Sequence, residues 1–383
     1  MTLSTDQQYA LDQIQNSSHK MFFITGDAGT GKSFVISQLR NTRLCAPTGV
    51  AAQLIGGCTI HRLLGIRPDA KFANPKTLFK RIKNCDYLIV DEVSMVGFEL
   101  FNLLITAYHL CGWRGKIIFV GDFAQLPPVR DQPCFNHMEW NKVQMLKLTT
   151  NHRQADPEFV KFLNYVRNAE TNDFVRNYLR ERLDTPCPGR IYLASRTHQV
   201  GEINSQRITE ALADGREFRD YKSSVRSLSG YWPENKCVDD IIKNGRTMYA
   251  IRLFEGARVM VTRNESTYVN GTLGTVVGFD NSIVLVRGDD GMDHHVKRID
   301  HEVYDGEGRA LYIQNQFPLA YGYAITLHKS QGTTLAQAHV ELDGIFTDGQ
   351  AYVGFSRLSS GSGLTVSGDI DSLYLSVLPN IPN

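Results

Sequence analysis

Short apolar runs alternate with helical stretches along the first 150 residues or so of this 383-residue chain. The runs Phe22–Ile24, Tyr87–Val90 and Ile117–Val120 each lead into a polar or glycine-containing turn, and Arg43–Ala46, stopped by Pro47, is a weaker candidate. Strands of a parallel sheet are buried on both faces and therefore read as continuous apolar runs. The pattern predicts a parallel sheet with crossover helices.

A second region of this kind begins near Asn141. It contains the apolar run Ile191–Ala194 and the helix-like stretch Val200–Leu212, and it resumes after Pro318 with Ala338–Leu342. Between these pieces, β-branched runs broken by glycine-rich turns extend from about Arg258 to Ile313. Such spacing predicts a small all-β insertion, a barrel or sandwich. We therefore expect an α/β protein with a first lobe over 1–145, a second lobe over 146–250 and 316–383, and an insertion over 251–315.

Composition restricts the partners and the compartment. There are 41 Lys and Arg against 40 Asp and Glu, a net charge of +1, so contact with nucleic acid must rest on a local cluster of charges. None of the seven cysteines forms a Cys-x-x-Cys pair, which favours a reducing compartment. The polar N-terminus does not resemble a signal peptide, and no run reaches the roughly 20 apolar residues of a membrane span. We expect a cytoplasmic protein.

A phosphate-binding loop is the most specific motif. Gly26-Asp27-Ala28-Gly29-Thr30-Gly31-Lys32-Ser33 follows an apolar strand and leads into a helix-forming stretch, the setting that this motif requires. Its glycines let backbone N–H groups close on phosphate oxygens at a helix N-terminus. Lys32 would neutralise the β- and γ-phosphates of ATP, and the hydroxyl of Ser33 would bind Mg²⁺.

Carboxylates and an amide follow at the ends of two later strands. Asp91 is predicted to hold Mg²⁺ and Glu92 to activate the attacking water, since ligands bind at the carboxyl ends of parallel strands. Gln125 is a candidate sensor of the γ-phosphate or of the water, although a simple loop residue before Pro127 is the alternative. Arg153 and Arg357 are candidates for the positive charge that a second lobe supplies to the transferring phosphoryl group.

The order of the motifs resembles that of a superfamily 1B DNA helicase of the Pif/RecD-like (Dda-like) branch. The matching segments are Leu3–Gln7, Gly26–Ser33, Ala46–Ala52, Thr59–His61, Asp91–Met95, Gly121–Pro128, Asn151–Gln154, Asn270–Gly274, Ala324–Gly332 and Gln350–Arg357. The resemblance implies two RecA-like lobes, 1A and 2A, with ATP between them, and an SH3-like insertion, 2B. It also implies that Gln7 reads the adenine and that Arg153, Arg357 and Gly332 complete the ATP site from the second lobe.

For DNA, the resemblance implies 5′→3′ movement along a single strand and unwinding of tailed or forked duplexes in replication or repair. Hydroxyl, imidazole and ammonium groups on both lobes suit a strand-tracking motor, which contacts phosphates without reading base edges. The candidate DNA-binding residues are Pro47, Thr48, Gly49, Thr59, His61, Phe72, Thr326, His328 and Lys329. We expect a bacterial or phage-encoded protein that is a monomer in solution.

Two positions depart from the family pattern. His152 stands where an aromatic residue often precedes the arginine of the Asn151–Gln154 motif, and the wedge segment, about residues 65–80 and including Phe72, is short. Two other functions are consistent with the residues alone. One is a DNA-stimulated ATPase that acts as a switch or clamp without translocating. The other is a passive single-strand-binding module, which would need neither Glu92 nor the arginines.

Overall fold

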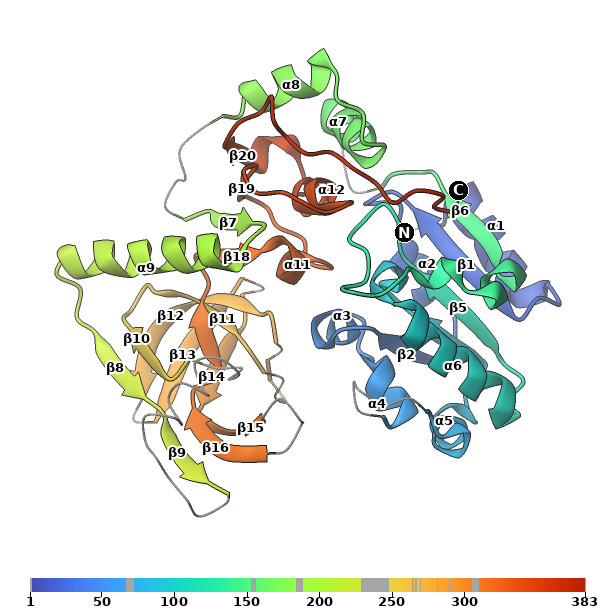
Figure 1. The fold of residues 1–383 in the computed structure, drawn as a ribbon, viewed down its shortest axis with the longest axis horizontal. Helices are drawn as coiled ribbons and strands as arrows, with labels where there is room; N and C mark the ends of the chain where they lie inside the picture. The colour runs from blue at the N-terminus through green and yellow to red at the C-terminus, as the bar shows by residue number, and fades with distance from the viewer. Residues whose placement is uncertain are drawn as a thin grey trace. The chain divides into compact units, whose positions relative to one another are not determined.

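The computed structural model describes residues 2–66, 72–152, 156–183, 189–228, 248–263, 265, 267–268, 270–280, 282–289, 291–304 and 310–382. The chain forms two compact units, one of residues 1–196 and 326–383 and the other of residues 197–325. The first unit contains two sheets (Figure 1). No helix within the described ranges has both the length and the apolar character needed to cross a bilayer.

The first sheet has six strands, and each neighbouring pair is parallel. In the spatial order β3-β2-β4-β5-β1-β6, the strands are Cys58–Thr59, Thr42–Ala46, Tyr87–Val90, Lys116–Val120, Met21–Gly26 and Gln144–Leu148. The predicted parallel sheet is confirmed, including the weaker candidate at Arg43–Ala46. Its last strand, β6, crosses the predicted lobe boundary at residue 145.

Helices cover both faces of this sheet (Figure 1). Phe22 and Ile24 of β1 pack into one hydrophobic cluster with α1 (Thr5–Asn16), whereas Phe23 between them packs into a second cluster on the other face with α6 (Phe98–Cys111). Burial on both sides explains why these strands read as continuous apolar runs. The helices are α1 (Thr5–Asn16), α2 (Lys32–Ser37), α3 (Gly49–Leu54), α4 (Ile60–Leu64), α5 (Pro75–Ile82) and α6 (Phe98–Cys111).

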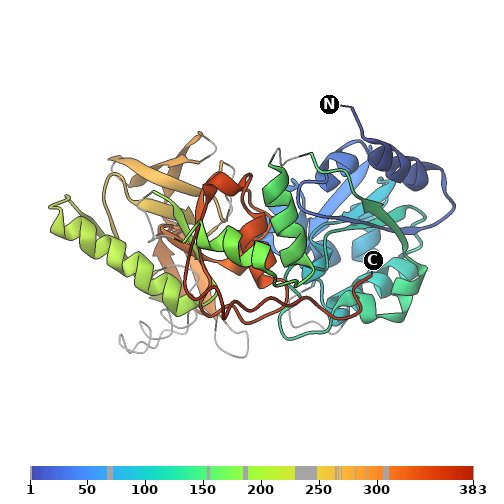
Figure 2. The ribbon, with the colours of Figure 1, turned by 90° about the horizontal axis from the view of Figure 1, so that it is seen from above.

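In the second, four-stranded sheet, three neighbouring strands are parallel: β7 (Ile191–Ala194), β19 (Ala338–Glu341) and β20 (Leu364–Ser367). The ring of Phe162 stacks on Tyr178 and meets Phe355 edge-on, so helices from both halves of the lobe share one aromatic core. The helices are α7 (Pro157–Arg167), α8 (Asp173–Arg180), α11 (Leu327–Ser330) and α12 (Gln350–Ser356). Both ribbon views show the C-terminal segment running from β20 to the lobe of the first sheet (Figure 1, Figure 2), where Ile381 packs on its core.

The second unit is rich in antiparallel strands. Its five-stranded sheet has the order β14-β13-β12-β11-β17, formed by Asp293–Lys297, Ile283–Gly288, Leu273–Asp280, Arg258–Val261 and Leu319–Tyr321. Two smaller sheets contain β8 (Arg219–Lys222) with β10 (Ala250–Leu253), and β9 (Ser224–Ser227) with β16 (Ala310–Gln316) and β15 (Ile299–Tyr304).

The predicted β insertion is therefore present, but this unit starts well before residue 251. Two residues of α9 (Thr197–Ala213), Ile208 and Ala211, are part of its core. The chain then leaves the unit along β18 (Ala324–Thr326). The SH3-like character of the insertion stays a prediction.

Candidate nucleotide site

The phosphate-binding loop joins β1 to α2, and its backbone requires glycine. Gly31 is the N-cap of α2 and has a φ of 78°, a left-handed conformation that side chains disfavour. A Cβ at this position would lie 2.4 Å from Nε2 of Gln7. Nζ of Lys32 donates hydrogen bonds to the carbonyl oxygens of Gly26 (2.6 Å) and Asp27 (3.0 Å), so the ammonium is held inside the loop. Its burial lowers the pKa of Lys32.

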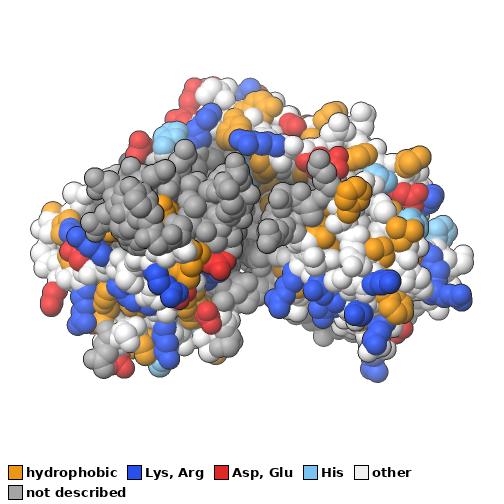
Figure 3. All heavy atoms as spheres, turned by 60° about the horizontal axis from the view of Figure 1, so that its bottom comes forward, with side chains coloured by type: hydrophobic (Ala, Val, Ile, Leu, Met, Phe, Trp, Pro, Cys, Tyr) orange, Lys and Arg blue, Asp and Glu red, His pale blue; other side chains and the backbone are white. Residues whose placement is uncertain are grey.

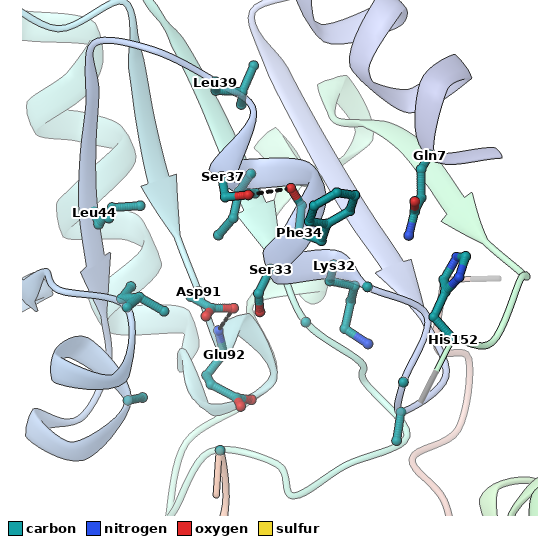
Figure 4. Close-up of a pocket in the computed structure, with 18 of the residues that line it drawn as sticks. Gln7, Lys32, Ser33, Phe34, Ser37, Leu39, Leu44, Asp91, Glu92 and His152 are labelled. Atoms are coloured by element: carbon teal, nitrogen blue, oxygen red, sulfur yellow. Dashed lines mark hydrogen bonds between the residues drawn. The ribbon is translucent and has the colours of Figure 1, made fainter. Parts of the chain in front are cut away.

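A cavity of about 950 Å³ opens beside this loop. It brings together eleven of the predicted nucleotide-site residues from both lobes: Gln7, Ala28, Gly29, Gly31, Lys32, Ser33, Asp91, Glu92, Gln125, Gly332 and Arg357. Figure 4 shows Lys32 and Ser33 entering it from α2, opposite Asp91 and Glu92 at the end of β4. The remaining predicted loop residues, Gly26, Asp27 and Thr30, fix the loop itself, since Thr30 Oγ1 donates to the Asp27 carbonyl at 2.9 Å.

The two carboxylates adopt a constrained arrangement. Glu92 has a φ of 50°, unusual for a residue with a side chain, and its N–H donates to Oδ1 of Asp91 at 2.9 Å. Burial, and then the charge of Glu92, raises the pKa of the Asp91 carboxyl to about 7. A bound cation would stabilise the ionised form of a buried carboxylate that lies beside a second one. Oxygen ligands such as Asp91 and the Ser33 hydroxyl suit Mg²⁺ bound to nucleotide phosphates, so the residues present fit that ion.

Residues of the second lobe reach into this cavity. Nη2 of Arg357, at the end of α12, lies 3.5 Å from Oε1 of Gln125. Nε2 of Gln331 lies 3.3 Å from Oε2 of Glu92. Gln125 therefore meets the predicted arginine. Gln331 lies within the Ala324–Gly332 motif but was not among the site residues predicted from the sequence. The polar residues around it were the signal that could have identified it.

Arg167 was not identified from the sequence as a site residue. This arginine ends α7, and its guanidinium is bidentate to Asp122, with Nε–Oδ2 at 3.2 Å and Nη2–Oδ1 at 2.9 Å. Its Nε also lies 3.0 Å from Oδ1 of Asp27 in the phosphate-binding loop. Burial opposes the charge on Arg167, but Asp122 outweighs it and raises the pKa of the guanidinium. The hydroxyl of Tyr352 accepts a hydrogen bond from Ala28 N at 3.1 Å nearby.

The segment that crosses to the second lobe also borders the cavity. The N–H of His152 donates to the carbonyl of Gly29 at 2.9 Å, and its Nε2 lies 3.3 Å from Ser4 Oγ. Gln7, predicted to read adenine, donates from Nε2 to the Thr30 carbonyl at 3.0 Å and accepts from Ser4 N at 3.1 Å. His152 thus lies beside Gln7 at the edge of the cavity (Figure 4). The predicted Arg153 lies outside the described residues.

The predicted DNA-binding residues do not line the nucleotide cavity, and four of them form a matching pair of turns. Thr59 caps α4 by accepting from the N–H three residues later at 3.1 Å, and Thr326 caps α11 in the same way at 3.3 Å. The histidine two residues after each threonine, His61 or His328, has a lowered pKa because it is partly buried. Each turn thus presents a hydroxyl, an imidazole and a following Arg or Lys.

The other candidates lie near these turns in the sequence. Thr48 caps α3 by accepting from Ala51 N at 3.2 Å, with Pro47 before it and Gly49 after it. Lys329 is exposed at the end of α11. Phe72, ahead of α5, has 85% of its surface exposed, so it does not serve as a packing residue in the first core.

Known proteins resemble this chain over nearly its whole length. A family model described as an AAA domain matches residues 2–183. The ATP-dependent DNA helicase Pif1 of Bdellovibrio bacteriovorus is 33% identical, covering 96% of this chain and 88% of the relative. The human ATP-dependent DNA helicase PIF1 is 32% identical over 99% of this chain, which spans 63% of the human protein.

Solved structures agree with these relatives. The crystal structure of Pif1 helicase from Candida albicans is 28% identical with a TM-score of 0.79, covering 99% of this chain and 98% of that one. The structure of Bacteroides Pif1 bound to single-stranded DNA is 27% identical with a TM-score of 0.78, covering 98% and 94%. Together with the loop, the paired carboxylates and the arginine that meet in one cavity, these similarities show that the chain belongs to the Pif1 helicases of superfamily 1B, as its motifs predicted.

Proposed function

We propose that this ATP-dependent DNA helicase translocates 5′→3′ along single-stranded DNA and thereby unwinds tailed and forked duplexes. The observation that carries the proposal is the composition of the nucleotide cavity. Its loop and carboxylates come from the first lobe, whereas Gly332, Thr333 and Arg357 come from the second. A site shared between two lobes ties hydrolysis to their closure, which is what a motor requires.

The predicted catalytic residues would each have a role in phosphoryl transfer. Lys32 would leave its carbonyl partners to neutralise the β- and γ-phosphates, and Glu92 would orient and activate the attacking water. Ser33 and Asp91 would hold Mg²⁺, which when bound neutralises charge on the phosphate oxygens. Arg357, with Arg153, would stabilise the charge that develops in the transition state.

A short path links the proposed strand contacts to this chemistry. Thr326, His328 and Lys329 stand on or next to α11, which has four residues, and Gln331 follows immediately and contacts Glu92. A shift of α11 on binding a DNA phosphate would therefore move the residue that touches the catalytic carboxylate. The matching turn at Thr59 would hold the strand on the first lobe, and alternate grip at the two turns would advance it.

The family supports the choice of partners. The structure of Pif1 helicase from Bacteroides is a complex with ADP-AlF3 and single-stranded DNA. A further similar structure concerns DNA unwinding at forked double-stranded DNA by two coordinating Pif1 helicases. Single-stranded DNA, tailed and forked duplexes, ATP and Mg²⁺ are accordingly the partners proposed for this chain. A monomeric state, a cytoplasmic location and a role in replication or repair stay predictions from the sequence.

Strand displacement on duplexes with a 5′ or a 3′ single-stranded tail, with and without ATP, tests the proposal. We expect displacement only with ATP and only from the 5′ tail. Displacement from the 3′ tail alone would overturn the polarity. DNA-stimulated ATP hydrolysis without displacement from either substrate would instead indicate the switch or clamp, and binding indifferent to ATP would indicate a passive module.

A further inference from the structure

Positive charge is concentrated in one segment of this nearly neutral chain. Between Phe34 and Cys85 there are nine Lys or Arg residues but a single acidic residue, Asp69, against totals of 41 and 40 for the whole protein. The rest of the chain therefore has a net negative charge. A local excess of this size is the electrostatic footprint of a polyanionic partner rather than the mixed charge of an ordinary surface.

Helix α5 presents part of this charge as a stripe. Asn74 caps the helix by accepting from Lys76 N at 3.0 Å, and Leu78 and Ile82 bury one face in the first core. Three exposed lysines stand at intervals of four and three residues on the opposite side, which places them on one face of a helix. This lysine face consists of Lys76, Lys80 and Lys83.

The lysine face has no acidic partner among the described residues. None of the ion pairs formed there includes any of its three lysines, and α5 itself contains no Asp or Glu. The right-hand part of the surface in Figure 3, on the side of the first lobe, shows Lys and Arg side chains gathered with few acidic ones between them. Neighbouring positive charges without acidic partners repel one another and destabilise the folded chain, and a bound anion reduces this repulsion.

Helix α5 packs against α4, the helix that carries the turn of Thr59 and His61, one of the two turns proposed to contact the single strand. Nη1 of Arg81 donates to the carbonyl of Leu63 at 2.9 Å, which joins α5 directly to α4. Thr59 and His61 stand at the start of α4, and the exposed Arg62 follows them. The lysine face therefore stands on the helix that is hydrogen-bonded to α4, the helix that begins at Thr59.

We propose that the lysine face binds the phosphate backbone of the double-stranded arm of a tailed substrate; this rests on the proposed function. From Lys76 to Lys83, the C-cap residue of α5, the backbone rises about 10 Å, the axial length of about three base pairs of B-form DNA. Lysine supplies flexible point charges that position a backbone without reading sequence. A rigid duplex can meet all three ammonium groups at once, whereas the single strand is held at the threonine turns.

Equilibrium binding of two DNAs tests this: a 5′-tailed duplex and the same tail alone, each titrated from about 50 to 200 mM salt. The variant is K76A/K80A/K83A, and the matched control, K142A/K147A/K161A, removes the same charge from exposed lysines elsewhere in the first unit. The variant should bind the tailed duplex at least about tenfold more weakly at low salt, with the slope of log K against log salt smaller by roughly two to three. The tail alone should bind as tightly as before, and the control should behave as the native chain on both DNAs.

A charge-preserving variant, K76R/K80R/K83R, should restore binding of the tailed duplex. Equal weakening on the tail alone would overturn the proposal in favour of single-strand contact, and unchanged binding of both DNAs would show a merely solvated surface. An effect seen only when a fork carries a second tail would assign the face to the displaced strand. ATP hydrolysis by the native chain in the presence of the single-stranded tail distinguishes failure of this proposal from failure of the proposed function. If the proposed function were wrong, the tail would not stimulate hydrolysis. If only the lysine face were wrongly assigned, the tail would still stimulate it.

Discussion

Arg167 offers a direct way to perturb the junction of the two lobes. Its guanidinium joins α7 to Asp122, whose side chain is 0% exposed, and to Asp27 in the phosphate-binding loop. In Arg167→Leu, the Asp122 carboxylate would be left buried with only the N–H of Ala124, 3.0 Å away, as a donor among the hydrogen bonds that the structure shows. Removing one partner of a buried pair leaves an uncompensated charge.

The size of the effect follows from burial. The Arg167 side chain is 13% exposed, so the pair with Asp122 belongs to the class in which loss of one partner costs about 3–5 kcal/mol. Asp27 is 38% exposed and well screened by solvent, so its contribution is small. For a unit of this size, a loss of about 3 kcal/mol lowers Tm by roughly 6–12 °C.

Thermal and urea unfolding of the native chain, Arg167→Leu and the double variant Arg167→Leu/Asp122→Leu measure the effect. The double variant should recover most of the lost stability, because replacing a whole buried pair with apolar groups is often neutral or favourable. The single variant should also bind ATP more weakly, since Asp27 loses the group that positions it. If Arg167→Leu were less than about 1 kcal/mol less stable than the native chain and bound ATP equally well, Arg167 would form no more than a weak, solvent-screened ion pair.

Three further predictions concern the cavity itself. Arg357→Ala should lower DNA-stimulated ATP hydrolysis by about a thousandfold or more while ATP binding persists; loss of binding instead would make Arg357 a structural residue. Gln331→Ala should reduce the stimulation by DNA more than the basal rate, measured as hydrolysis with and without single-stranded DNA, and equal losses would remove Gln331 from the proposed path to Glu92. In metal-free protein, the pKa of Asp91 is raised from its ordinary value of 3.8 to about 7. Between these pH values the folded chain keeps a proton that the unfolded chain has released. The free energy of unfolding therefore falls as pH rises from about 4 to about 7. The urea midpoint of Asp91→Asn should therefore fall less than that of the native chain between about pH 5 and pH 8, and parallel curves would contradict the assignment.

Local motifs were predictable from the sequence because their geometry is local. The loop from Gly26 to Ser33 and the carboxylates at Asp91 and Glu92 each follow directly from a buried strand, so spacing along the chain fixes their positions in space. Arg167 gives no such signal. Its partners Asp27 and Asp122 are distant in sequence, and an arginine at the end of an amphipathic helix usually faces solvent.

The borders of the β insertion escaped prediction for a different reason. Strand β8 is Arg219–Lys222, a polar and largely exposed strand without the apolar alternation that identifies a half-buried one. Helix α9 was predicted correctly as a helix, but periodicity cannot show which core it covers. Ile208 and Ala211 turn out to pack on the antiparallel strands rather than on the second parallel sheet.

Hydrolysis in the nucleotide cavity is proposed to drive movement along the strand. Single-turnover unwinding of a 5′-tailed duplex by the native chain and by Lys32→Ala, with DNA binding measured in parallel, tests it most directly. Because Lys32 is the charge within the loop that would meet the β- and γ-phosphates, the variant should bind the tailed duplex normally yet neither hydrolyse ATP nor displace the strand. Unwinding by Lys32→Ala at the native rate would show that hydrolysis in this cavity does not drive strand movement.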